Sequence, residues 1–262
     1  MRTVLITGAT DGLGRELALR LGAAGDRVLV HGRDRGRAER VGAEIVAAGG
    51  PEPEILLAEL GELRAVGKLA GGISGGLDVI VNNAGIGAGR PGTAREVSAD
   101  GIELRFAVNY LAGYYLTRLL LPRLAPNGRI VNVASAGQQA VDFDDPMMER
   151  GWDGFAAYQR SKLAQIMFTV DLAAELPGVL VNALHPATFM NTTMVTESGV
   201  TPTSTVAEGA DATMRLITGT DLPTGRYFNG LHESRAHSQA YDAHTRERLR
   251  ELSDALIARA VG

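Results

Sequence analysis

The chain has 262 residues, of which 45% are hydrophobic, so it can bury a substantial core and one α/β domain spanning 1–262 is expected. Its formal net charge of −4 argues against nucleic acid as the main partner, because a phosphate backbone calls for a basic surface. It has no cysteine, which excludes disulfides, a thiolate nucleophile and cysteine-ligated metal sites, and which fits a cytoplasmic location.

Short runs rich in Val, Ile and Leu alternate with longer segments of helical periodicity. The predicted strands are Thr3–Thr7, Arg27–His31, Glu54–Ala58, Leu77–Asn82, Arg129–Ala134 and Val179–His185. The predicted helices are Leu13–Ala24, Arg37–Ala48, Glu62–Ile73, Ala99–Leu124, Ala156–Glu175 and a closing helix within Gln239–Ala260. Continuous apolar runs indicate strands buried on both faces, and strict alternation predicts a Rossmann-type doubly wound parallel sheet with helices on both faces.

Neither a leader nor a membrane span is expected. Met1 leads directly into the first predicted strand, which leaves no room for a signal peptide. The longest apolar run, Leu116–Leu124, contains Arg118, Pro122 and Arg123, so it does not reach the length of a span.

The first predicted strand runs into a glycine-rich loop that precedes a helix. Glycines permit a tight turn and a close approach of backbone to pyrophosphate, and the helix N-terminus supplies free N–H groups and a positive dipole end. This position favours a dinucleotide site over a turn that binds nothing. The expected contacts to the cofactor are Thr7, Gly8, Thr10, Asp11, Gly12, Leu13 and Gly14.

The end of the second strand bears on which nicotinamide cofactor is used. An NAD site of this kind holds an acidic residue there, but the chain has Gly32 followed by Arg33 and Asp34. A guanidinium can pair with a 2′-phosphate, so NADP(H) is predicted over NAD(H). The alternative makes Arg33 a solvated surface charge and Asp34 the ribose ligand.

Tyr158 and Lys162 are four residues apart on a predicted helix and therefore share one face. A cation beside the phenol favours the phenolate, so the pKa of Tyr158 is expected to lie nearer neutrality than usual. Such a tyrosine can transfer a proton between an alcohol and a carbonyl. Ser135, at the end of a strand, is placed to hydrogen-bond a substrate oxygen.

With these motifs in place, nearly the whole chain resembles the short-chain dehydrogenase/reductase family. Thr7–Gly14, with its Gly-x-x-x-Gly-x-Gly spacing, resembles the family's cofactor loop. Asn82-Asn83-Ala84-Gly85 resembles the motif after the fourth strand, and His185-Pro186 the segment after the sixth. Asn109, Ser135, Tyr158 and Lys162 resemble its catalytic set.

The resemblance implies further roles. Lys162 would lower the pKa of Tyr158 and hold the nicotinamide ribose, while Asn109 would anchor a water that links Lys162 to solvent. Further cofactor contacts are implied for Glu59, Leu60, Asn83, Ala84, Gly85 and Pro186. Glu59 would face the adenine, although an acid at a helix N-terminus has an ordinary structural role as well. A second basic residue found in the loop of NADP-binding relatives is missing, because Asp11 occupies its place.

Two long segments, 136–157 and 187–205, are expected to wall the substrate crevice. Their large apolar side chains form either a lipophilic pocket or anchors for the loops themselves: Phe143, Trp152, Phe155, Phe189 and Met190. The length of the first segment, and the sequence that follows Tyr158, resemble the retinol-dehydrogenase-like branch of the family. That resemblance implies an alcohol or carbonyl on a bulky apolar skeleton.

The predicted function is that of an NADP(H)-dependent oxidoreductase acting on a small-molecule alcohol or carbonyl. The alternatives are a non-catalytic NAD(P)-binding regulator or scaffold, and an enzyme of different chemistry with the same cofactor. The histidines show no metal-ligand spacing, so no catalytic metal is expected. Many relatives pair through the helices expected from Ala99 and Ala156, which implies a homodimer or homotetramer.

Overall fold

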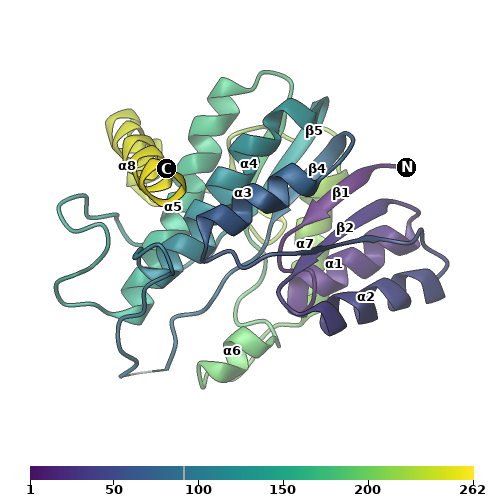
Figure 1. The fold of residues 1–262 in the computed structure, drawn as a ribbon, viewed down its shortest axis with the longest axis horizontal. Coiled ribbons are helices and arrows are strands. Elements are labelled where there is room, and N and C mark those ends of the chain that lie inside the picture. Colours follow the sequence, from purple (N-terminus) through teal and green to yellow (C-terminus); the bar gives the residue numbers. More distant parts are fainter. Residues whose placement is uncertain (91) are drawn as a thin grey trace.

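The computed structural model describes residues 1–90 and 92–262 and centres on one eight-stranded sheet (Figure 1). The strand order is β3-β2-β1-β4-β5-β6-β7-β8, and all neighbours run parallel except β7 and β8. The strands are β1 Thr3–Ile6, β2 Arg27–Gly32, β3 Glu54–Leu57, β4 Leu77–Asn82, β5 Leu124–Val133, β6 Leu180–His185, β7 Tyr227–Asn229 and β8 His232–Ser234. The predicted doubly wound sheet is confirmed, and its order reverses between β1 and β4.

Helices cover both faces of the sheet, with α1, α2 and α7 on one side and α3, α4, α5 and α8 on the other (Figure 1). The α-helices are α1 Gly12–Ala23, α2 Arg35–Ala47, α3 Leu63–Gly72, α4 Ala112–Leu120, α5 Gly154–Glu175, α6 Thr193–Glu197, α7 Val206–Thr218 and α8 Ala243–Val261. The described residues also form the π-helix η1 Phe106–Leu111 and the 3-10 helices η2 Leu121–Arg123 and η3 Ser238–Tyr241. Within the described residues, no helix is both long and apolar enough to cross a membrane.

Alternating residues of the central strands supply the two halves of the core. In β1, Val4 and Ile6 pack under α1, α2 and α7, whereas Leu5 between them packs under the helices of the opposite face. All three side chains have no exposed surface. Because successive side chains of a strand point to opposite faces, a continuous apolar run is what a doubly covered sheet needs.

The predicted helix Ala99–Leu124 is wrong at both ends. Its first residues form a turn in which Ser98 Oγ accepts the N–H groups of Asp100 and Ile102, and Gly101 has a φ of 73°. This turn competes with the helix for the same backbone groups, so the helix begins later. At the other end, Pro122 lies in η2 and β5 already begins at Leu124, earlier than the predicted strand from Arg129.

The prediction omitted α6, α7, β7 and β8. The signal for α7 was present as a capping box, in which the Thr205 hydroxyl accepts the N–H of Glu208 and the Glu208 carboxylate accepts that of Thr205. Strands β7 and β8 have three residues each, which is too short for a recognisable pattern.

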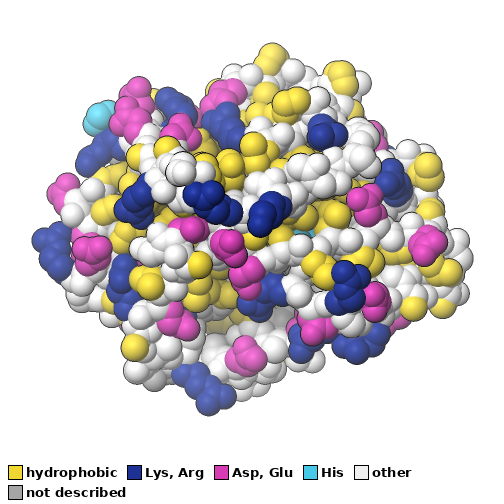
Figure 2. Space-filling model, in the orientation of Figure 1, with side chains coloured by type: hydrophobic (Ala, Val, Ile, Leu, Met, Phe, Trp, Pro, Cys, Tyr) yellow, Lys and Arg dark blue, Asp and Glu magenta, His cyan; other side chains and the backbone are white. Residues whose placement is uncertain are grey.

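Charged side chains of both signs are interspersed over the face seen in Figure 2. Several charged side chains of the protein are paired at close range, such as Arg27 with Glu54 at 2.8 Å. Exposed pairs of this kind contribute little to stability, so the buried core remains the main source of the fold's free energy.

Candidate active site

The predicted site residues gather at the carboxyl edge of the sheet. Thr7 follows β1, Asn83 follows β4, Ser135 follows β5 and Pro186 follows β6. These are neighbouring strands on both sides of the reversal between β1 and β4. In an open parallel sheet, this is where ligands bind, in the crevice beyond the strand ends.

Asn83 holds the glycine-rich loop in place. Its Nδ2 donates to the carbonyl oxygens of Thr7 at 2.8 Å and of Gly8 at 3.1 Å. In return, the Thr7 hydroxyl accepts the N–H groups of Asn83 and Ala84, both at 3.0 Å. The two motifs that were predicted to contact the cofactor therefore fix each other.

The loop has the close backbone packing that the glycines predicted. Gly8 has a φ of 65°, which favours glycine. A Cβ on Gly14 would lie 2.2 Å from the Gly8 carbonyl oxygen, and one on Gly32 would lie 2.4 Å from Thr10 Cγ2. The cradle at the start of α1 thus depends on these glycines, and its shape fits the pyrophosphate of a dinucleotide.

Asp11 and Leu13 have structural roles in the protein in addition to the cofactor contacts that were predicted for them. Asp11 caps α1, since its Oδ1 accepts the Gly12 N–H at 2.7 Å. Its Oδ2 accepts the Thr193 hydroxyl at 2.7 Å, which joins the cofactor loop to α6. The Leu13 side chain is buried in the core, so the backbone N–H is the part of Leu13 that faces the loop.

His31 is a member of the site that sequence reasoning missed. Its Nδ1 accepts the Gly8 N–H at 3.2 Å, which leaves the proton on Nε2 to donate to the Ala58 carbonyl at 3.2 Å. Burial lowers the pKa of His31 from 6.5 to about 4. A neutral imidazole therefore links the cofactor loop to the end of β3.

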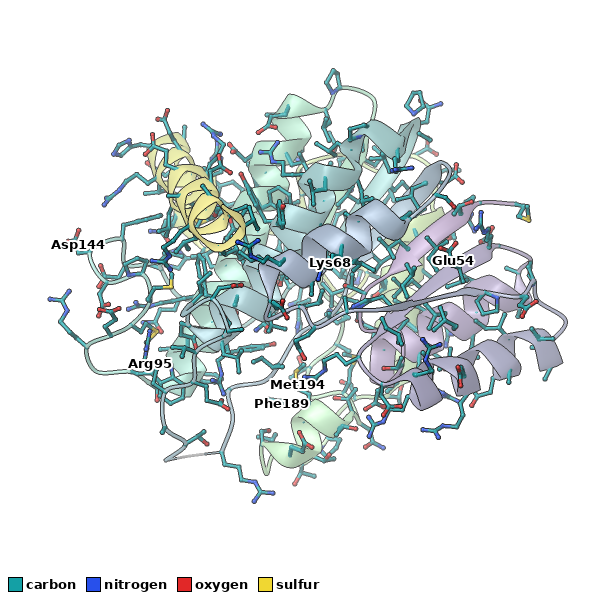
Figure 3. The ribbon with its side chains drawn as sticks, in the orientation of Figure 1. Glu54, Lys68, Arg95, Asp144, Phe189 and Met194 are labelled. Carbon is teal, nitrogen blue, oxygen red and sulfur yellow. The ribbon has the colours of Figure 1, made fainter. Side chains whose placement is uncertain are left out.

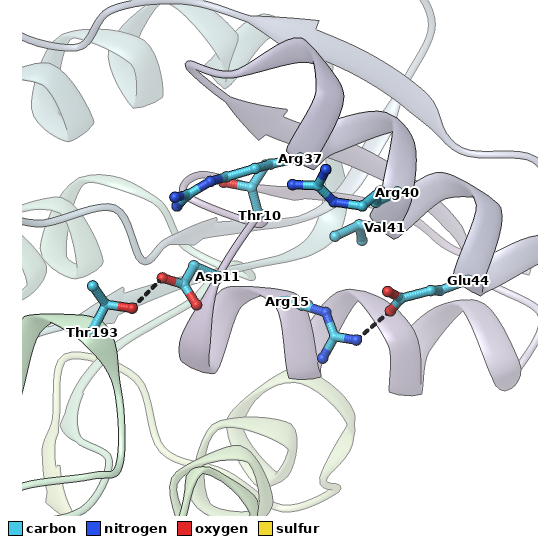
Figure 4. Close-up of a pocket in the computed structure, with 8 residues that line it drawn as sticks. All are labelled: Thr10, Asp11, Arg15, Arg37, Arg40, Val41, Glu44 and Thr193. Carbon is cyan, nitrogen blue, oxygen red and sulfur yellow. Dashed lines mark hydrogen bonds and ion pairs between the residues drawn. The ribbon is translucent and has the colours of Figure 1, made fainter.

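The side of the crevice beside α1 and α2 is polar and rich in arginine. A cavity of about 320 Å³ is lined there by Thr10, Asp11, Arg15, Arg37, Arg40, Val41, Glu44 and Thr193 (Figure 4). Arg37 and Arg40 project over it from α2, and they were absent from the predicted contacts. Arg33 is largely exposed and lies 3.4 Å from Glu59, whose other oxygen accepts the Gly61 N–H. Leu60 is buried in the core beside them.

Ser135 and Tyr158 lie together beyond the end of β5. Burial raises the pKa of Tyr158, and the Ser135 side chain opposes that rise without cancelling it. The expected lowering of the Tyr158 pKa by Lys162 is therefore wrong for this structure. Desolvation penalises the phenolate more strongly than its neighbours stabilise it.

Lys162 is buried below Tyr158 on α5. Its Nζ donates to the Val133 carbonyl at 2.8 Å and to Gln165 Oε1 at 3.0 Å, and it lies 5.8 Å from the centre of the Tyr158 ring. Burial lowers the pKa of Lys162 to about 7. The lysine therefore loses part of its charge near neutral pH, and burial sets the direction of the pKa shift of both Tyr158 and Lys162.

Asn109 lies in the π-helix η1, an irregularity that is frequent at functional sites. Its side chain accepts the Ile86 N–H at 2.7 Å and donates to the Ile86 carbonyl at 3.1 Å and to Ser161 Oγ at 3.0 Å. The Ser161 hydroxyl donates in turn to the Tyr158 carbonyl at 2.7 Å. A Cβ on Gly85 would lie 3.2 Å from Asn109 Oδ1 and 3.5 Å from Lys162 Nζ. The structure thus brings Asn109 and Lys162 to the same end of the crevice.

The large apolar residues of the two wall segments divide into two groups. Phe143 and Met190 are packed against the core, and Trp152 is anchored by a 3.3 Å bond from Nε1 to Glu103 and by Arg105 over its ring. Phe155 and Phe189 are instead 57% and 47% exposed. Figure 3 places Phe189 on the side of the molecule where α6 lies. Three of the five predicted residues are therefore anchors, and two are available to an apolar ligand.

Comparisons with known proteins identify the family. The sequence model of the short chain dehydrogenase family matches residues 2–202. Human retinol dehydrogenase 14 is 35% identical over an alignment that covers 98% of this chain and 86% of that protein. An uncharacterised protein from Mycobacterium paratuberculosis has a crystal structure with a TM-score of 0.84 and 30% identity, covering 98% of this chain and 94% of that one.

A third relative has bound ligands. Landomycin C-6 ketoreductase LanV, solved with bound NADP and rabelomycin, gives a TM-score of 0.70 and 27% identity over 87% of this chain and 94% of that one. These similarities agree with the glycine-rich cradle and with the cluster of Ser135, Tyr158 and Lys162, and together they identify the family. The chain belongs to the short-chain dehydrogenase family, in its retinol-dehydrogenase-like branch, and is an oxidoreductase acting on alcohol or carbonyl groups.

Proposed function

We propose that this protein reduces a carbonyl on an apolar skeleton with NADP(H), with Tyr158 as the proton donor. The observation that carries the proposal is the position of the buried Lys162, whose Nζ donates to the Val133 carbonyl at the end of β5 and lies 5.8 Å from the centre of the Tyr158 ring, while Ser135 follows the same strand. In the proposed site, the Ser135 and Tyr158 hydroxyls act from one side of the crevice, next to the glycine-rich loop. A carbonyl oxygen between these hydroxyls would receive two hydrogen bonds.

Burial favours the protonated form of Tyr158. A raised pKa keeps Tyr158 protonated near neutral pH, which is the form that donates a proton to a developing alkoxide. Ser135 would polarise the carbonyl and fix its orientation while the proton moves. The cofactor supplies the hydride when bound. Lys162 and the backbone around Gly85 would hold the nicotinamide ribose.

Three arginines support NADP(H) over NAD(H). Arg33 stands at the end of β2, and Arg37 and Arg40 project from the next helix over the 320 Å³ cavity. A 2′-phosphate carries the negative charge that such a cluster favours. The basic residue that Asp11 displaces from the loop is thus compensated from α2. The NADP bound in LanV lends further support.

The exposed aromatic residues bear on the substrate. Phe155 and Phe189 belong to the two wall segments, and each keeps a large part of its surface exposed, 57% and 47% respectively. Exposed aromatic rings at a crevice favour a bulky apolar ligand, since they gain most from its contact.

The proposal is tested by measuring NADPH oxidation with a panel of bulky aromatic and aliphatic ketones. Turnover by the wild type and its loss in Tyr158→Phe, with NADPH binding retained in both, is the expected result. Tight NADPH binding without turnover across the panel would contradict the proposal and favour a non-catalytic binding protein.

A further inference from the structure

Lys162 has a side-chain partner outside the predicted catalytic set. Gln165 lies three residues further along α5, and its Oε1 accepts a hydrogen bond from Lys162 Nζ at 3.0 Å. Both side chains are 3% exposed. The Val133 carbonyl, at 2.8 Å, is the other acceptor of Nζ. A buried ammonium is costly unless its donors are satisfied, so Gln165 contributes directly to keeping this charge inside the protein.

The two acceptors also fix the orientation of the ammonium group. An ammonium has three N–H groups in tetrahedral directions, and Val133 and Gln165 occupy two of them. Because Gly85 has no side chain, Nζ stays open on the side where a Cβ would lie 3.5 Å away. One N–H is therefore left for the cofactor ribose or the Tyr158 oxygen.

The chemistry of the partner matters as much as its position. The groups that face Lys162 are the Tyr158 ring on α5, the Val133 carbonyl on β5, Gly85 after β4 and the neutral amides of Asn109 and Gln165. None of these groups carries a formal charge while Tyr158 is protonated. An amide oxygen stabilises the ammonium without neutralising it, whereas a carboxylate would form an ion pair and cancel its field at Tyr158.

We propose that Gln165 is a positioning residue for Lys162, which orients the ammonium toward the cofactor site and favours its charged form. Its role in catalysis rests on the proposed function. Its effect on Lys162 does not, because the hydrogen bond belongs to the protein itself.

Two substitutions should move the titration of Lys162 in opposite directions. Burial already lowers the pKa of Lys162 to about 7, so one hydrogen bond shifts its charge within the working range of pH. Gln165→Met removes an acceptor and should lower the Lys162 pKa by about one unit or more, while Gln165→Glu adds a negative charge and should raise it.

The composition of the chain makes this measurement direct. It has only two lysines, Lys162 and Lys68, and Lys68 is exposed on α3 (Figure 3). In protein labelled with ¹³C at lysine Cε, NMR therefore gives two titrating resonances, of which Lys68 is the internal control. We expect the Lys162 curve to move to lower pH in Gln165→Met and to higher pH in Gln165→Glu, while the Lys68 curve stays in place.

The pH profile of kcat/KM provides the second readout. The part of this profile that depends on the charged form of Lys162 should shift along the pH axis in the same direction as the NMR titration in each variant. A general loss of packing would not produce such a matched shift. If Gln165→Met does not fold, Gln165→Glu decides alone. An unchanged Lys162 curve, or a shift of both variants in one direction, would overturn the inference. If the wild type reduces no ketone while the curves shift as expected, the proposed function fails and the positioning role of Gln165 stands.

Discussion

In the proposed mechanism, proton transfer depends on the hydroxyl of Tyr158. Burial raises the pKa of Tyr158, so the phenol is the group that would deliver a proton to the reacting oxygen. Replacing it with phenylalanine keeps the ring and removes the donor. We expect Tyr158→Phe to lower kcat by about 10²- to 10⁴-fold with little change in the Kd for NADPH. Tyr241→Phe, at an exposed position on η3, is the matched control.

The proposed preference for NADP(H) depends on charge at the end of β2. Arg33→Ala should lower kcat/KM for NADPH by about tenfold to 100-fold and leave that for NADH nearly unchanged, because a charged hydrogen bond to the 2′-phosphate is lost. Arg37→Ala should act in the same direction. Arg35→Ala is the control, since Arg35 pairs with Glu39 on the exposed side of α2. Equal losses with both cofactors would show that Arg33 does not read the 2′-phosphate.

At the scale of elements, His31 makes the cofactor loop sensitive to acid. It joins the loop after β1 to the end of β3, and burial keeps it neutral with a pKa of about 4 against an ordinary 6.5. Below about pH 6.5 the unfolded chain takes up a proton that the folded chain does not. The contribution of His31 to the free energy of unfolding is therefore fully present above that pH and is lost as the pH falls toward 4. The total loss is about 3 kcal/mol.

The measurement is the free energy of unfolding in urea at several pH values between 4 and 7.5, for the wild type and His31→Gln. Other groups titrate in both proteins, so the difference between the two curves isolates His31. The variant should lose less stability on acidification than the wild type. Parallel curves would show that His31 does not titrate as the structure indicates.

Elements and site residues could be predicted from the sequence mainly where a local pattern along the chain determines them. Tyr158 and Lys162 were recognisable because a helix places them on one face, and Gly8 and Gly14 because tight turns need glycine. His31 was not recognised, since its partners come from the loop after β1 and the residue after β3. Gln165 lies only three residues from Lys162 on α5, so the range of the interaction does not explain why it was missed. The helix predicted from Ala99 begins later in the structure because the Ser98 turn, a local hydrogen-bonding pattern, overrode helical periodicity.

At the scale of the whole molecule, α8 lies against the helices that were expected to pair with a second subunit. The Tyr110 hydroxyl lies 2.8 Å from Ser253 Oγ, and the Tyr114 hydroxyl donates to Asp254 at 2.8 Å. Arg250 pairs with Asp171 of α5 at 2.6 Å. Surface of η1, α4 and α5 is thus already covered by the chain's own C-terminal helix.

We therefore expect a monomer rather than the homodimer or homotetramer that the family resemblance implies. Sedimentation equilibrium at micromolar concentration, with and without NADPH, measures the mass in solution. A stable dimer that cross-links between α4 and α5 of two chains would contradict this expectation, because α8 would have to move away.

The most direct test of the central claim follows the two hydrogens of the reaction separately. NADPH carrying deuterium at one face of nicotinamide C4 is incubated with an accepted ketone, and the alcohol is analysed by mass spectrometry and NMR. The wild type should transfer deuterium to the carbinol carbon on one face of the carbonyl only. Tyr158→Phe should form at least about 10²-fold less of the deuterated alcohol. Undiminished deuterium transfer in Tyr158→Phe would contradict the assignment of Tyr158 as proton donor.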